Sequence, residues 1–175
     1  MRIFSKTTFK TLALLAALGF VAFWLLSAPR PLTASDLPTH TGDVANGERL
    51  YHAAGCHSCH LPGPDAAGID AALPAGGTPL KTPVGIFYPP NLTPDPETGL
   101  GSYGAEQIKA ALKNGTRMNG LKVAPPMSLF IPHISGLTDE DLDALVAYLG
   151  SLRPAKRTVP EPELTPEAQK LVSAP

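Results

Sequence analysis

Both cysteines of the chain lie in one turn, in the run AAGCHSCHLPG at residues 53–63, and a histidine directly follows the second cysteine. A structural zinc site needs four ligands, usually from a second CxxC or HxxxH pair, and Cys56 and Cys59 have no such companion pair. A thioredoxin-like redox pair belongs beside a βαβ pattern, whereas a Pro- and Gly-rich run follows His60. The sequence therefore argues against both zinc and dithiol redox chemistry.

Covalent haem attachment is the third chemistry that uses a CxxC pair. The two thiols reach one edge of the macrocycle and add to its vinyl groups, and the histidine after the second cysteine presents a ring nitrogen to the iron. Cys56, Cys59 and His60 stand in this order. They predict one haem c with His60 as an iron ligand, and the alternative is a lone oxidised cysteine pair.

The N-terminal segment predicts export from the cytoplasm. Arg2, Lys6 and Lys10 precede an uncharged apolar run from Thr11 to Ala28. This run is nearer in length to a membrane span of about 20 residues than to the apolar core of about 7–15 residues in a signal peptide. Bulky leucines occupy the candidate cleavage sites, which favours an uncleaved anchor over a cleaved signal peptide. The basic flank keeps the N-terminus in the cytoplasm, so we expect a single-pass protein of the cytoplasmic membrane with its remainder on the periplasmic side.

The rest of the chain reads as one small domain with connectors. We divide the sequence into a signal-anchor at residues 1–28, a Pro-rich linker at 29–42, a monohaem domain at 43–152 and a C-terminal tail at 153–175. In the tail, Thr165 and Pro166 suit the start of one more helical turn or two.

Three helices are expected in the haem domain, at residues 43–55, 105–115 and 137–152. Asp43 and Thr138 are suited to cap the first and third of these helices, Asn114 and Gly115 to stop the second, and Gly150 to end the third. No segment alternates with period two over a useful length. The expected fold is all-α, with long Pro/Gly-rich loops and an N-terminal transmembrane helix.

The order of helix, CxxCH, Pro/Gly-rich loop, short helix, loop methionine and terminal helix resembles a class I cytochrome c. Such folds cross their first and last helices at a small residue and an aromatic, which implies Gly47 or Tyr51 against Tyr148. Residues 76–104 are similar to the cytochrome c subunits of membrane-bound alcohol, aldehyde and gluconate dehydrogenases. In those subunits a TPxGxFY run is followed by an N-(I/L)-T-PDPETG-(I/L)-G run. They usually carry three haem domains, whereas this chain has one CxxCH motif.

The second axial ligand has three candidates after the haem motif, namely Met118, Met127 and His133. Pro125 and Pro126 stiffen the backbone just before Met127, and the resemblance places the family's ligand methionine in the same kind of loop. Met127 is therefore the expected ligand. Packing in the loop is the alternative role for Met118, and exposure to solvent is the alternative for His133.

The proline-rich loop is expected to shield the haem from water, because prolines restrict the backbone and donate no hydrogen bonds. The resemblance implies that Asn91 and Thr93 orient the haem propionates or their neighbours, and Asn91 is taken as a cofactor-binding residue. The alternative is that Asn91 caps a turn that Thr93 continues.

These features favour an electron carrier over an enzyme. With His60 and Met127 both on iron, no coordination position remains for a substrate, so single electrons would pass between a dehydrogenase or quinol-oxidising complex and a terminal oxidase. The alternatives are a five-coordinate haem enzyme or gas sensor, if Met127 does not bind iron, and an assembly subunit whose haem only stabilises the fold. No nucleotide loop or hydrolase motif is present in the sequence, and we expect no nucleic-acid partner.

A local basic run consists of Lys109, Lys113, Arg117 and Lys122. It predicts either a surface that steers an acidic redox partner or an ordinary solvated helix face.

Overall fold

The computed structural model describes residues 6–27, 42–117 and 119–173. The chain divides into two compact units, residues 1–31 and 32–175. The predicted linker, except Gly42, and the candidate ligand Met118 lie outside the described residues.

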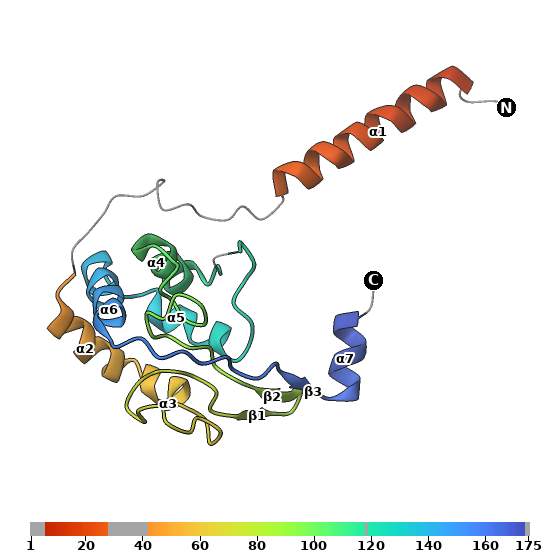
Figure 1. Cartoon of the computed structure of the whole chain (residues 1–175). Helices are drawn as coiled ribbons and strands as arrows, with labels where there is room; N and C mark the ends of the chain where they lie inside the picture. Colours follow the sequence, from red (N-terminus) through yellow and green to blue (C-terminus); the bar gives the residue numbers. More distant parts are fainter. Residues whose placement is uncertain (1–5, 28–41, 118, 174–175) are drawn as a thin grey trace. The chain divides into compact units, whose positions relative to one another are not determined.

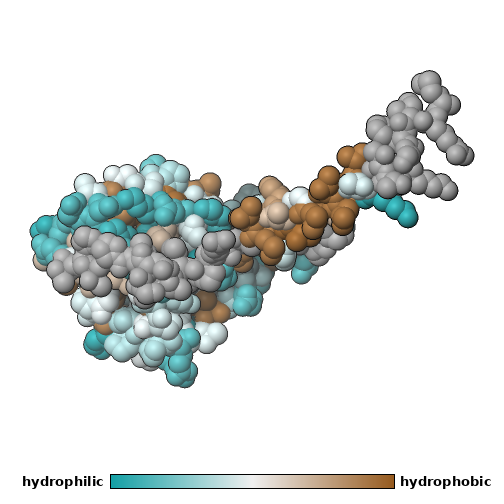
Figure 2. Space-filling view, turned by 90° about the horizontal axis from the view of Figure 1, so that it is seen from above, coloured by the Kyte–Doolittle hydropathy of each residue, from teal (hydrophilic) through white to brown (hydrophobic). Residues whose placement is uncertain are grey.

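The described part of the first unit is helix α1 (Lys6–Ser27). Its segment Lys10–Ser27 has a mean hydropathy of 1.8 and no buried side chain, and Figure 2 shows it as the brown, apolar segment. Among the described residues this is the one helix long and apolar enough to cross a membrane. A signal sequence near the N-terminus would share these properties, so α1 is a candidate span.

The second unit is mostly helical, and its first and last long helices begin as the sequence predicts. The carboxylate of Asp43 accepts hydrogen bonds from the backbone N–H groups of Ala45 and Asn46 at 2.9 and 3.2 Å, and the Thr138 hydroxyl accepts from the N–H of Asp141 at 3.1 Å. These bonds satisfy N–H groups that have no partner inside the helix. The helices are α2 (Val44–Ala53), α3 (Cys56–His60), α4 (Ala105–Asn114), the 3₁₀ helix η2 (Met127–Leu129), α5 (Ile131–Ile134), α6 (Asp139–Ser151) and α7 (Pro166–Ser173) (Figure 1).

Two predicted helix ends and one predicted helix start can be compared with the structure. Gly115 ends α4 with a φ of 59°, a left-handed conformation that glycine adopts without strain. Gly150 instead lies inside the last turn of α6, which runs to Ser151. Thr165 caps α7 by accepting a hydrogen bond from the N–H of Ala168 at 3.3 Å, as expected.

A small antiparallel sheet, which the all-α expectation did not include, joins the long loop to the tail. Its strands are β1 (Leu80–Thr82), β2 (Gly85–Phe87) and β3 (Glu163–Leu164), in the order β1-β2-β3. Leu80 pairs with Phe87, and Gly85 pairs with Leu164. Strands this short cannot show a periodic pattern.

The core forms where α2 crosses α6. A Cβ on Gly47 would lie 1.9 Å from the carbonyl oxygen of Ala144, so the two backbones are in direct contact. Next to this contact, the rings of Tyr51 and Tyr148 lie with their centroids 5.3 Å apart. Both contacts confirm the predicted crossing. Tyr51, Leu145 and Leu149 form the centre of the buried cluster.

Two of the four basic residues that were expected to form one exposed run pair with acids of α6. Lys109 forms an ion pair with Asp143 at 2.7 Å, and both side chains are 11% exposed. Burial alone would lower the pKa of Lys109, but the hydrogen bond to Asp143 and the attraction of the nearby carboxylates together outweigh it, so the pKa is raised. Lys113 pairs with Asp139. Lys109 is therefore not part of an exposed basic run, whereas the Lys113 side chain is 42% exposed.

Candidate haem site

Helix α3 holds the three residues of the haem motif on one side. Cys56, Cys59 and His60 stand at positions i, i+3 and i+4, which share a helix face. Gly55 precedes the helix with a φ of 72° and makes the sharp turn from α2. Both thiols are free, and burial raises the pKa of the Cys56 thiol, which keeps it protonated.

The ring of His60 is buried and fixed in orientation. Its residue exposure is 6%, and Nδ1 donates a hydrogen bond to the carbonyl oxygen of Pro90 at 3.0 Å. A carbonyl can only accept, so Nδ1 carries the proton and Nε2 is left with a lone pair for a metal. Burial lowers the pKa of His60, which favours the neutral, ligating form of the ring.

Two glycines connect the backbone of the motif helix to the Pro89–Pro90 segment. The N–H of Gly76 donates to the carbonyl oxygen of His60 at 2.8 Å, and the N–H of Gly77 donates to that of Pro89 at 2.9 Å. Both glycines are buried and have positive φ values, 77° and 87°. The Gly-Gly pair belongs to the site although no role was assigned to it from the sequence, and Pro90, expected only to help shield the haem, also supplies the carbonyl that accepts from His60. The Gly-Gly dipeptide was the available signal.

Asn91 lies next to Pro90, 2% exposed, and its side chain is fully engaged with the protein. Its Nδ2 donates to the Thr98 hydroxyl at 3.2 Å and to the carbonyl oxygen of Ala155 at 2.7 Å. Its Oδ1 accepts from the N–H and the hydroxyl of Thr93, at 2.9 and 2.8 Å. These bonds match the turn-capping alternative and add a link to the residues after α6.

Met127, the expected second ligand, begins η2 and is half-buried. It follows Pro126, which is joined to Pro125 by a cis peptide bond, and it comes shortly before α5, which packs against α4. The competing candidate His133 is exposed.

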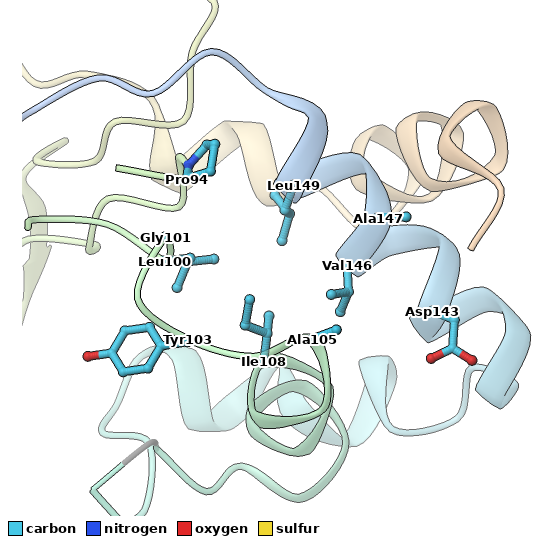
Figure 3. A pocket seen from close by; sticks show the side chains of 11 residues that line it. Pro94, Leu100, Gly101, Tyr103, Ala105, Ile108, Asp143, Val146, Ala147 and Leu149 are labelled. Atoms are coloured by element: carbon cyan, nitrogen blue, oxygen red, sulfur yellow. The ribbon is translucent and has the colours of Figure 1, made fainter. Parts of the chain in front are cut away.

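A cavity of about 310 Å³ lies between the loop at residues 94–103, α4 and α6 (Figure 3). Leu100, Ile108, Val146 and Leu149 point into it, and Asp143 at its rim is its one charged lining residue. None of the expected haem residues lines this cavity.

The residues of α3 fit a haem and do not fit a protein-only metal site. They offer two free sulfurs and one imidazole nitrogen on a single helix face, the set that two thioether bonds and one axial bond require. Within the described ranges, no three His, Cys, Asp or Glu side chains are grouped to hold a metal ion.

Comparison with known proteins gives the same picture. Residues 44–153 match the family model described as Cytochrome c. The chain is 33% identical over 153 residues to a "Diheme cytochrome c-type" protein of Cereibacter sphaeroides, covering 83% of this chain and 48% of that protein. It is 31% identical over 161 residues to the fructose dehydrogenase cytochrome subunit of Gluconobacter japonicus, covering 91% of this chain and 30% of that subunit.

A third relative is the gluconate 2-dehydrogenase cytochrome c subunit of Pantoea cypripedii, 37% identical over 106 residues that cover 60% of this chain and 22% of that subunit. The chain thus spans half or less of the length of these relatives. The family model covers most of the chain, including the haem motif, the core helices and the loop methionine, and so this protein belongs to the cytochrome c family.

Proposed function

We propose that this protein is a membrane-anchored monohaem c-type cytochrome. It carries single electrons between a periplasmic or membrane dehydrogenase, or a quinol-oxidising complex, and a terminal oxidase. The observation that carries this proposal is the buried His60 ring, which is held through Nδ1 with Nε2 left to bind iron, beside two free thiols of the same helix face.

Membership of the cytochrome c family implies a covalently bound haem c. In our proposal Cys56 and Cys59 would hold it through thioether bonds, and His60 and Met127 would be the ligands of its iron. The haem supplies a one-electron Fe(III)/Fe(II) couple. With His60 and Met127 both bound to the iron, no coordination position would remain for a substrate or oxygen, and the protein would act as a carrier rather than as an enzyme.

Asn91 keeps a place in the site as a positioning residue. Its four hydrogen bonds to Thr93, Thr98 and Ala155 fix the backbone directly after Pro90, whose carbonyl orients His60. The proposal of one haem rests on the two cysteines in the sequence, which form a single CxxCH motif. A dehydrogenase partner is supported by the names of the fructose and gluconate dehydrogenase relatives.

The membrane attachment is part of the proposal. Helix α1 is apolar enough to span a bilayer, and the basic residues Arg2, Lys6 and Lys10 favour a cytoplasmic N-terminus. The haem domain would then lie on the periplasmic side, with the anchor at residues 1–28, the linker at 29–42, the domain at 43–152 and the tail at 153–175.

The absorption spectrum of the purified holoprotein tests the ligation. We expect a weak sulfur-to-iron charge-transfer band in the far red for the oxidised form and no binding of carbon monoxide to the reduced form. Met127→Ala should lose the band and bind carbon monoxide, whereas the matched control Met118→Ala should keep the wild-type behaviour. A wild-type protein that lacks the band and binds carbon monoxide readily would instead have an open iron site, as in a haem enzyme or gas sensor.

A further inference from the structure

We propose that Ala155 and Arg157, in the tail after α6 ends at Ser151, form a proximal clamp and that Arg157 is a positioning residue for His60. This inference rests on the proposed ligation of the haem iron by His60. It assigns a function to part of the tail, which neither the haem motif nor the loop signature points to.

The backbone of the proximal clamp is fixed by side chains of the long loop. The carbonyl oxygen of Ala155 accepts from Asn91 Nδ2 at 2.7 Å, and its N–H donates to the Thr93 hydroxyl at 3.1 Å. The N–H of Arg157 donates to the Thr98 hydroxyl at 2.8 Å. Asn91 and Thr93 are 2% and 0% exposed, so water cannot readily replace these bonds.

The side chain of Arg157 is directed into the protein rather than into solvent. It is 5% exposed, and its Nη2 donates to Asp65 Oδ1 at 2.7 Å. The guanidinium lies directly on the backbone of Gly77, where a Cβ would be 2.3 Å from Nη2, and it is close to Gly63, where a Cβ would be 3.2 Å away. Glycine at position 77 is thus required both by its φ and by the arginine packed on it.

Gly77 links the clamp to the iron ligand. Its N–H donates to the carbonyl oxygen of Pro89, and the next carbonyl, that of Pro90, accepts the hydrogen bond from His60 Nδ1. The neighbouring Gly76 donates to the backbone carbonyl of His60 itself. Arg157 therefore packs on the Gly76–Gly77 segment, which hydrogen-bonds to the backbone of His60 and to Pro89, directly before the ring's partner Pro90.

The function of this arrangement follows from the hydrogen bond that it protects. An N–H group of a ligating imidazole held to a carbonyl fixes the ring's tautomer and orientation and raises its basicity as a ligand. If the Arg157 side chain is removed, Gly77 loses its packing contact with the guanidinium. The backbone at Pro89–Pro90, which Gly77 holds by a hydrogen bond, should then become more mobile. The ring proton of His60 should then exchange with solvent more often.

Proton exchange at His60 Nδ1, followed by NMR in the reduced holoprotein, tests the proposal. Arg157→Gln should accelerate this exchange by roughly tenfold, measured relative to the slowly exchanging amides of α6. A tenfold change corresponds to the free energy of about one hydrogen bond lost from the local opening equilibrium. The matched control is Lys156→Gln, which removes the same charge from the adjacent position. Lys156 is 65% exposed and pairs with Glu97 at 2.5 Å, so we expect less than about a twofold change.

Asp65→Asn provides a second variant in case Arg157→Gln folds poorly. Asp65 is 61% exposed, and its loss releases one end of the guanidinium without removing the arginine, so a smaller acceleration of about two- to threefold is expected. Unchanged exchange in both variants overturns the proposal, as does an acceleration that the α6 amides share equally, since that is global unfolding. The haemochrome spectrum and the mass of the purified protein report separately on the proposed function. If both show that the protein carries no covalent haem, the proposed function is refuted.

Discussion

Gly47→Ala tests whether the contact between α2 and α6 sets the stability of the fold. The added Cβ would lie 1.9 Å from the carbonyl oxygen of Ala144, 2.6 Å from its carbonyl carbon and 2.7 Å from the Cβ of Tyr148. The two nearest atoms are backbone atoms of a helix, so no side-chain rotation relieves the clash. The helices must separate by more than an ångström, because ordinary Cβ contacts begin near 3.4 Å.

The expected magnitude combines two opposing effects. Overpacking a close contact costs about 1–3 kcal/mol, and the backbone clash at position 47 places the cost at about 3 kcal/mol. Alanine is favoured over glycine inside a helix by about 1 kcal/mol, which offsets part of this cost. We therefore expect Gly47→Ala to lower the free energy of unfolding by about 2 kcal/mol.

Urea unfolding of the holoprotein, followed by far-UV circular dichroism, measures this change. With an urea dependence of about 2 kcal/mol per molar, the midpoint should fall by about 1 M. The matched control is Gly150→Ala in α6, where an added Cβ meets nothing within 4 Å. Because position 150 is in the last turn, the control should be neutral or stabilising by up to about 1 kcal/mol. Equal midpoints for the two variants would refute the reasoning that the crossing needs a glycine.

Three further substitutions test electrostatic contacts. Lys109→Gln removes the ion pair of Lys109 with the largely buried Asp143 and should lower the free energy of unfolding by about 2–3 kcal/mol. Lys113→Gln removes an exposed ion pair and should lower it by less than about 0.5 kcal/mol, so similar urea midpoints would contradict this. Hydrogen bonds from Thr98 hold the pKa of Asp95 below its usual 3.8, so this carboxylate adds stability above that pH and loses it as the pH falls through the lower native pKa. Asp95→Asn should flatten the loss of stability below about pH 4, and an unchanged acid slope would count against the assignment.

The sequence correctly predicted features that depend on interactions between residues close together in the chain, such as helix caps and helix ends. Asp43 and Thr138 cap helices because a short polar side chain satisfies N–H groups two or three residues away, and Gly115 ends α4 because of its own φ. The Cys56, Cys59 and His60 set is equally local, since all three lie within five residues of one helix.

Contacts between distant segments could not be read in the same way. Asn91 was associated with the haem by resemblance, but its side chain bonds to Thr93, Thr98 and Ala155, and the last of these lies 64 residues away. The basic run was interpreted as either a docking surface or a solvated helix face, both of them exposed, whereas Lys109 turns inward to Asp143. The contacts of Asn91 with Ala155 and of Lys109 with Asp143 produce no periodic pattern in the sequence. Each depends on how two segments distant in the chain pack against one another.

The sequence by itself indicated that two thiols and a histidine lie together in one turn, and that an apolar run precedes the domain. It also located α2, α4 and α6, but not the short helices α3, η2 and α5. The tertiary structure decided how the histidine ring is held, since its partner carbonyl at Pro90 comes from a loop 30 residues further along the chain. It also decided that the tail closes over that loop, through Arg157 on Gly77 and β3 on β2. The physical reason is that spacing within a helix is fixed by its backbone geometry, whereas the position of a loop is fixed only when the whole chain has packed.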